Sequence, residues 1–236
     1  MTGRTLLGVW AHPDDEAYLS AGLMAEFRQR GDRVVVLTAT LGEHGTSDPQ
    51  TWPPRKLAAL RRTELRDSLA AVGVHESRLL GYEDGHCADV DGSDVVAEHI
   101  VDVDPDLIVT FGPEGMTGHP DHRAVSEWTT HAWTTTGSHA ELWYATLTPD
   151  FHRTWGKLND EIGLWIDQPA PPCTEHVDLA TSTSLRDDVL DRKIAALRAH
   201  ASQTTPLIEH AGPSRFREWW RTESFRAAGV VALSAR

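Results

Sequence analysis

The chain has 236 residues, of which 40% are hydrophobic and 24% are charged. These proportions are ordinary for a folded globular protein and exclude the disordered and fibrous classes. The length suits a single α/β domain spanning residues 1–236. Acidic residues number 35 against 22 Lys and Arg, which gives a formal net charge of -13. Because this balance opposes a large basic surface, we do not expect nucleic acid as a partner.

Cysteines and apolar stretches indicate the cellular setting. The two cysteines, Cys87 and Cys173, lie far apart and form no Cys-x-x-Cys pair, so neither a disulfide framework nor a thiolate zinc site is expected. The segment from Met1 to Trp10 lacks the charged start and long apolar core of a signal peptide. No apolar stretch approaches the roughly 18 residues that a membrane span requires. We therefore expect a cytoplasmic protein without a membrane span.

The chain begins with an apolar run, a helical stretch and a second apolar run. Thr5 to Trp10 and Arg33 to Thr40 have the Val- and Leu-rich composition of buried parallel strands. Between them, Pro13 to Arg30 is predicted as a helix. It has a proline and three acidic residues in its first turn, and Gly31 follows its last turn. Together these segments form one βαβ unit.

The same alternation continues to residue 147. Further strands are predicted at Arg78 to Tyr82, Asp106 to Phe111 and Glu141 to Leu147, and further helices at Pro54 to Val72, Ser93 to Val103 and Asp121 to Trp133. Strands that alternate with helices favour a Rossmann-like, doubly wound α/β fold. Such a fold has a mostly parallel sheet with helices on both faces.

Residues 148–180 interrupt this pattern. Prolines and glycines break every long period in this region, so we predict an irregular excursion. A helix with apolar residues on one face returns over Leu185 to Ala201. Trp155 and Trp165 lie in the excursion, where tryptophan can wall a sugar-binding pocket, although packing in a core or an interface is its commoner role.

Two short motifs concentrate chemistry directly after predicted strands. The first is Ala11-His12-Pro13-Asp14-Asp15-Glu16, and the second is Gly118-His119-Pro120-Asp121-His122. Ligands of open α/β sheets bind beyond the carboxyl ends of strands. A catalytic zinc site takes three protein ligands, with histidine and carboxylate among the usual donors. We therefore predict that His12, Asp15 and His122 hold a divalent metal, zinc by preference, with Fe2+ or another divalent ion as the alternative.

The remaining polar residues of the two motifs suggest acid and base roles. Asp14 is adjacent to the predicted metal and is the candidate general base that accepts a proton from water. His119 is the candidate acid that protonates a departing amine, and Asp121 is its candidate orienting partner. A lone histidine after a strand, or a lone acid in a first helical turn, is usually structural. Two His-Pro-Asp tripeptides at two strand-to-helix turns are much harder to ascribe to local structure.

At these residues the sequence resembles the PIG-L/LmbE family of zinc-dependent N-deacetylases. The Ala-His-Pro-Asp-Asp-Glu motif is intact at 11–16 and the His-Pro-Asp-His motif at 119–122. Weaker matches are Thr40-Leu41-Gly42-Glu43, Arg61 with Glu64, Asp84-Gly85, and His200-Ala201-Ser202-Gln203. The resemblance implies the same metal ligands, base and acid as above, and further implies that Glu43, Arg61 and Asp84 contact the substrate. It also implies a small N-acylated amino sugar or glycoconjugate as substrate, and it is compatible with a homo-oligomer.

One position departs from the family pattern. Members that act on the mycothiol precursor carry a tyrosine two positions before the first histidine of the second motif, where this chain has Thr117. The shorter hydroxyl reaches less far, which weakens a mycothiol assignment. Two alternatives to a sugar N-deacetylase remain. One is a metal-dependent amidase that acts on a non-sugar amide, such as a thiol conjugate or an antibiotic. The other is a non-catalytic, metal-bearing sugar-binding module.

Overall fold

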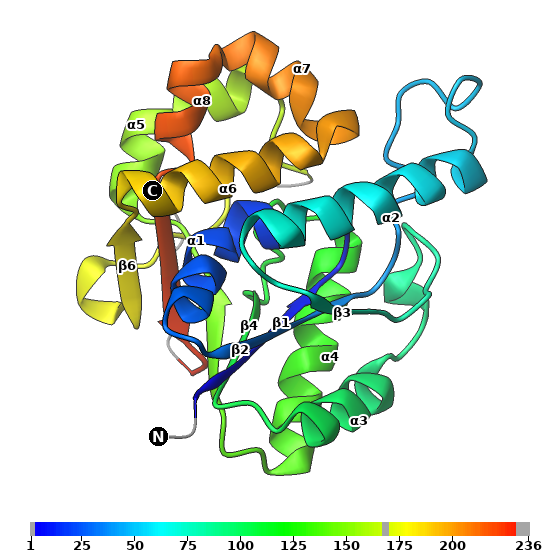
Figure 1. The fold of residues 1–236 in the computed structure, drawn as a ribbon, viewed down its shortest axis with the longest axis vertical. Coiled ribbons are helices and arrows are strands. Elements are labelled where there is room, and N and C mark those ends of the chain that lie inside the picture. The colour runs from blue at the N-terminus through cyan, green and yellow to red at the C-terminus, as the bar shows by residue number, and fades with distance from the viewer. Residues whose placement is uncertain (1–2, 167–169, 230–236) are drawn as a thin grey trace.

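The computed structural model describes residues 3–166 and 170–229 and arranges them around a seven-stranded sheet (Figure 1). Its strands, in their spatial order, are β3 (Glu76–Leu79), β2 (Arg33–Thr38), β1 (Thr5–Trp10), β4 (Leu107–Phe111), β5 (Glu141–Ala145), β7 (Thr222–Ala227) and β6 (Thr181–Ser184). Strands β1 to β5 pair in parallel, whereas β7 runs antiparallel to both β5 and β6. The predicted α/β fold with a mostly parallel sheet is therefore confirmed.

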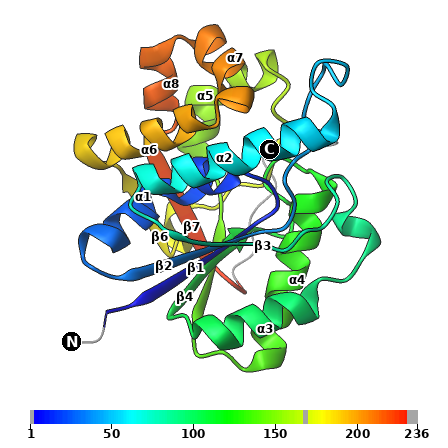
Figure 2. The same cartoon turned by 45° about the vertical axis from the view of Figure 1, so that its right-hand side comes forward.

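Helices cover both faces of this sheet (Figure 2). α1 (Asp15–Gln29), α2 (Pro54–Ala71) and α6 (Asp187–Ala199) pack together on one face, and α3 (Ser93–Val103) and α4 (Pro120–Thr136) lie on the other. α5 (Pro149–Glu161), α7 (Ala201–Ala211) and α8 (Pro213–Trp219) gather beside α6 at the top of Figure 1. Within the described ranges, no helix combines the length and the apolar character that crossing a bilayer would require.

The central strands consist of residues that suit a sheet covered on both faces. Every residue of β4 is buried, and β2 is buried from its second residue onward. β1 and β2 pair in register from Thr5 opposite Arg33 to Trp10 opposite Thr38. Because helices shield both faces, these strands are apolar along almost their whole length instead of alternating.

The predicted irregular excursion contains a helix. α5 occupies its first part, so the prediction for this part is wrong. Thr148 caps the helix by accepting a hydrogen bond of 3.2 Å from the backbone N–H of Phe151, and a proline stands in the first turn. Both are ordinary start signals, but Gly156 inside the helix obscured the helical period. Residues 167–169 of the excursion lie outside the described part of the chain.

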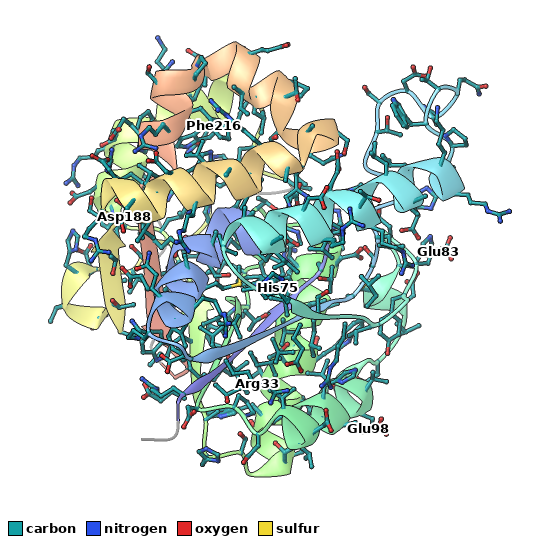
Figure 3. The ribbon with its side chains drawn as sticks, in the orientation of Figure 1. Arg33, His75, Glu83, Glu98, Asp188 and Phe216 are labelled. Atoms are coloured by element: carbon teal, nitrogen blue, oxygen red, sulfur yellow. The ribbon has the colours of Figure 1, made fainter. Side chains whose placement is uncertain are left out.

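The C-terminal part adds elements that the sequence analysis did not predict. α7, α8 and β7 follow α6, and β7 enters the sheet between β5 and β6. Glu223 of β7 is buried, accepts hydrogen bonds from the backbone N–H groups of Gly22 and Leu23, and lies 2.8 Å from the Nζ of Lys193. This charged cluster ties β7 to α1 and α6. Phe216, labelled in Figure 3, is buried where α8 faces α6.

The order of the strands reverses between β1 and β4. From β1 the sheet continues through β2 to β3, and from β4 it continues through β5 in the opposite direction. Ligands of doubly wound sheets bind at such a switch point, beyond the carboxyl ends of the strands. The loops after β1 and β4 carry the two histidine motifs. The topology therefore places both motifs at one edge of the sheet.

Candidate metal and catalytic site

Two loops at the switch point bring the predicted site residues together. His12 lies two residues after β1, and Asp15 begins α1 three residues later. His119 caps α4, and His122 lies in its first turn. The loop that leads from β4 to α4 turns at Gly115, where φ is 73° and a Cβ atom would clash with residues of α4. Only glycine adopts this conformation at so close an approach without strain.

Atoms that could bind a metal converge on one point from three side chains of these loops, namely His12, Asp15 and His122. The Nδ1 of His12 lies 3.2 Å from the Nε2 of His122. The two carboxylate oxygens of Asp15 lie 3.3 Å from the Nε2 of His122 and 3.6 Å from the Nδ1 of His12. Ligands about 2.0–2.2 Å from a tetrahedral zinc ion are separated by about 3.3–3.6 Å. The observed spacing thus fits one divalent cation.

The hydrogen bonds and pKa shifts of His12 and His122 indicate which of their ring nitrogens carry protons. The Nε2 of His12 lies 3.1 Å from a carboxylate oxygen of Asp84 and 3.2 Å from one of Asp121, so this nitrogen donates. The Nδ1 of His122 lies 3.0 Å from the carbonyl oxygen of Gly115 and donates to it. Burial lowers the pKa of His122 to about 4, so its ring is neutral. The Nε2 of His122 is then left as an acceptor. Although burial opposes it, hydrogen bonds to Asp121, Asp15 and Asp84 raise the pKa of His12 well above its usual value, so its Nδ1 also carries a proton and donates to His122 at 3.2 Å. A divalent cation bound between the two rings would replace that proton.

His12 also belongs to two other groups of side chains that could bind a metal. Ligand-type atoms lie within 4.8 Å of one another in the set of His12, His119 and His122, and in the set of His12, Asp84 and Asp121. The second set surrounds the Nε2 of His12, whose proton is held by the carboxylates of Asp84 and Asp121. It therefore orients the ring and leaves the Nδ1 side for the cation.

Asp14 has a backbone conformation that is rare for a residue other than glycine. Its φ is 111°, and its backbone N–H donates to a carboxylate oxygen of Glu16 at 2.9 Å. Such strain persists only where the surroundings hold it, and it is typical of functional sites. The carboxylate lies 3.4 Å from the guanidinium of Arg61 and faces the cavity described below. Burial raises the pKa of Asp14 to about 6, although Arg61 opposes the shift.

His119 presents one ring nitrogen to the cavity. Its Nδ1 accepts a hydrogen bond of 3.1 Å from the backbone N–H of Asp121, so the proton of the neutral ring resides on Nε2. Burial lowers the pKa of His119, and the nearby His12 lowers it further. The ring is therefore neutral and able to donate a hydrogen bond from Nε2.

The carboxylate of Asp121 has a different partner from the predicted one. It lies at the Nε2 of His12 and also accepts hydrogen bonds from the backbone N–H groups of Gly85 and Cys87, at 2.7 and 3.1 Å. The prediction that this carboxylate orients His119 is not what the structure shows, because only the backbone of Asp121 contacts that ring. The fully buried carboxylate instead links the loop after β3 to His12.

The three predicted substrate contacts differ in position. Arg61 lines the cavity, but its guanidinium donates to the carbonyl oxygens of Gly42 and Pro13. Asp84 also lines the cavity, with one carboxylate oxygen at His12 and the other accepting from the backbone N–H of His44 at 2.8 Å. Arg61 and Asp84 thus hold the loops as well as facing the pocket.

Glu43 does not line this cavity. One of its carboxylate oxygens accepts from the backbone N–H of Asp84 at 3.2 Å, and its side chain borders a separate hollow between α2 and the end of β3. The next two residues, His44 and Gly45, line the cavity instead. The sequence-based prediction was therefore one or two residues away from the part of this loop that faces the site.

A buried network beneath Asp14 was missed by the sequence analysis. One carboxylate oxygen of Glu16 accepts hydrogen bonds from the Nε2 of His200 and the hydroxyl of Ser68, both at 2.8 Å. The other oxygen holds the backbone of Asp14. Glu16 and His200 are completely buried, and this network connects α1 and α2 to the junction of α6 and α7 next to the candidate base. The sequence did contain a signal for this network, because Glu16 and His200 both belong to motifs quoted above, but neither residue was given a role.

A cavity of about 510 Å³ opens beside the converging donors. His12, Asp14, Asp15, His119 and His122 form one end of it. The opposite wall is apolar and comes from α1, α5, the segment 162–166, α7 and the residue after α8. The cavity thus has a polar end at the switch point and an apolar end formed by the C-terminal part of the chain.

Aromatic side chains line the junction between the two ends. The ring of Tyr18, one helical turn after Asp14, packs on Trp220 with ring centroids 4.4 Å apart. Its hydroxyl is buried, and none of the described residues offers it a hydrogen bond. Trp165 also lines the cavity, whereas Trp155 borders a different hollow.

Comparisons with known proteins agree with this site. The family model described as GlcNAc-PI de-N-acetylase, PIG-L, matches residues 7–133, which include both motifs. The 1D-myo-inositol 2-acetamido-2-deoxy-alpha-D-glucopyranoside deacetylase of Corynebacterium diphtheriae is 31% identical over an alignment of 230 positions. The alignment covers 86% of this chain and 77% of that protein.

Solved structures share the fold at lower sequence identity. The N,N'-diacetylchitobiose deacetylase of Pyrococcus horikoshii superposes with a TM-score of 0.68 at 22% identity, over 95% of this chain and 83% of that one. The 4-carboxy-2-hydroxymuconate hydratase of Pseudomonas putida has a TM-score of 0.62 at 16% identity, over 99% of each chain. Since the fold supports more than one reaction, the assignment depends on the motifs and the family match. With more than half of its residues matched by the family model, the chain belongs to the PIG-L family of de-N-acetylases.

Proposed function

We propose that this protein is a metal-dependent hydrolase that removes the N-acetyl group from an N-acetylglucosamine-type sugar. The observation that carries the proposal is the convergence of His12, Asp15 and His122 beside Asp14 at one end of a cavity. The relative from Corynebacterium diphtheriae and the structure from Pyrococcus horikoshii are both named as deacetylases of acetylated amino sugars. Family, site chemistry and cavity thus support the same reaction.

We propose that His12, Asp15 and His122 hold the metal, with zinc as the preferred ion. Two histidine nitrogens and one carboxylate match the ligand sets of catalytic zinc sites, and Fe2+ accepts the same donors. A bound ion of this kind polarises an acyl oxygen and lowers the pKa of water. Asp84 and Asp121 hold His12 in the ligating orientation through its Nε2.

Asp14 is the proposed general base. Its carboxylate faces the cavity next to the donors, and a pKa of about 6 suits proton transfer near neutrality. It accepts a proton from the attacking water, whose oxygen forms the new bond to the acyl carbon. Arg61 keeps the carboxylate in place through a contact of 3.4 Å.

His119 is proposed to act through a hydrogen bond. The sequence-based role as an acid requires a doubly protonated ring, which the lowered pKa opposes. The neutral ring instead donates from Nε2 to the acyl oxygen as negative charge develops there. When the C–N bond breaks, the amine nitrogen takes the proton that Asp14 accepted, which leaves the free amine and acetic acid and restores the base. The acetic acid keeps the second proton of the water and releases it to solvent as acetate forms.

A direct assay tests this function. Purified protein with added zinc is incubated with N-acetylglucosamine derivatives, and the free amine is measured. We expect amine release that stops after treatment with a chelator and returns when zinc is restored. Amine release that is insensitive to chelation, or its absence from every N-acetylated sugar tested with metal present, would reject the proposal.

A further inference from the structure

The apolar end of the cavity is larger than an acetyl group requires. Leu19, Phe151, Ile162, Leu164 and Leu207 all line it, together with the tryptophans at its junction with the polar end. An acetyl group offers a single methyl, and a sugar ring exposes mainly hydroxyl groups. Ligand pockets are generally lined by groups that match the ligand in polarity. This wall therefore matches a part of the substrate that neither the acetyl group nor the sugar supplies.

The wall packs against the protein core on one side, but the core does not cover it completely. Ile162 and Leu164 are half-buried, and Ile166 is 39% exposed, so their side chains remain open toward the cavity. Large aliphatic side chains left in contact with solvent at the rim of a polar site lose the stabilisation that burial would give. A bound apolar group would restore that burial.

Backbone contacts attach this wall to the reacting end. The backbone N–H of Ile166 donates to the carbonyl oxygen of Thr117 at 2.7 Å, and Thr117 belongs to the loop that carries His119. On the other side, Tyr18 and Leu19 extend α1 one turn beyond Asp14 and Asp15. A substrate whose amide lies at the polar end thus has its neighbouring atoms directed onto the apolar wall.

We propose that the amino-sugar substrate carries an alkyl or aryl group that packs against the apolar wall formed by Leu19, Phe151, Ile162, Leu164, Ile166 and Leu207. This inference rests on the proposed function and specifies its substrate class. The apolar group is either the aglycone on the sugar or the acyl chain on its nitrogen. Both present the same chemistry to the wall, and they differ in the side of the amide from which they extend.

Two substrate series distinguish these sources. One series holds the acetyl group constant and lengthens an alkyl aglycone on N-acetylglucosamine, and the other holds a methyl aglycone and lengthens the N-acyl chain. Each buried methylene contributes about 0.8 kcal/mol, or about a fourfold change in kcat/KM. We expect such a rise along one series, until the wall is covered. Turnover of the methyl glycoside with no rise along either series would overturn this inference and leave the deacetylase function intact.

Substitutions in the apolar wall test whether the rise in kcat/KM with chain length depends on contacts with this wall. Leu164→Ser and Ile166→Ser should lower the ratio of kcat/KM for the longest to the shortest member of the responding series by about tenfold. Val101→Ser, a matched change at an exposed position of α3 outside the cavity, should leave the ratio unchanged. Circular dichroism and thermal unfolding confirm that each variant is folded. An unchanged ratio in both folded wall variants would overturn the inference, and no turnover of any substrate would overturn it together with the proposed function.

Discussion

The two ends of the cavity are built in different ways. The polar end comes mainly from two short motifs, and its side chains are held by hydrogen bonds, such as those of Asp84 and Asp121 to His12. The apolar end comes from five separate segments, and its side chains are held mainly by packing. Hydrogen-bonded networks fail when one member is lost, whereas packed walls change in small increments. We therefore expect the polar end to determine whether the reaction occurs and the apolar end to determine which substrate is preferred.

The largest effect is expected at the candidate base. Asp14→Asn keeps the shape of the side chain but removes the group that accepts a proton, so kcat should fall about a thousandfold. The metal content per chain should remain that of the unaltered protein, because Asp14 is not among the converging donors. Asp178→Asn, at an exposed position outside the cavity, is the control. Full turnover by the Asp14 variant would contradict the mechanism.

A smaller effect is expected at a residue behind the metal site. Asp121→Asn removes the negative charge at the Nε2 of His12, and loss of such a partner weakens metal binding by about 10- to 100-fold. Competition with a chelating dye measures the dissociation constant for zinc. If zinc affinity is unchanged while kcat falls, Asp121 acts through His119 after all, as the sequence alone predicted.

Removing the hydroxyl of Tyr18 tests the junction between the polar and apolar ends of the cavity. Tyr18→Phe removes a buried hydroxyl for which no described residue is a partner, so folding stability should not decrease. If the substrate is its partner, kcat/KM should fall about tenfold, the value of one uncharged hydrogen bond.

Tyr144→Phe provides the matched control for this change. The hydroxyl of Tyr144 lies 2.8 Å from that of Thr130, away from the cavity. Its loss should lower the free energy of unfolding by about 1 kcal/mol and leave kcat/KM unchanged. Denaturant unfolding and steady-state kinetics on both variants give the two opposite signatures. A Tyr18 variant with unaltered kinetics would remove this residue from the substrate contacts.

The smallest effect is expected at the apolar end. Thr148→Ala removes the N-cap of α5 and should lower the free energy of unfolding by about 1 kcal/mol. Zinc affinity should be unchanged, because this cap contacts none of the converging donors. Urea unfolding and zinc titration measure the two quantities. A coupled loss of zinc affinity would show that the two ends are not energetically independent.

The sequence by itself determined the parallel half of the fold and the three side chains that converge at the candidate site. Apolar runs that alternate with amphipathic helices predict buried strands, because only a sheet covered on both faces accommodates such runs. His12, Asp15 and His122 could be singled out because each motif directly follows a strand, and a strand end, a turn and a first helical turn are local features. The structure brings these three side chains together; their role as ligands stays a prediction.

Only the tertiary structure decided the partners of these residues. The carboxylate of Asp121 orients His12 and not His119, because the backbone N–H groups of Gly85 and Cys87 draw it toward the loop after β3. The network of Glu16 with His200 joins residues 184 positions apart. Likewise, β7 pairs with β5, which is distant in sequence, and the apolar wall is assembled from segments that are far apart in the chain. Such contacts depend on which surfaces meet when the layers pack, and no local pattern of residues records that choice.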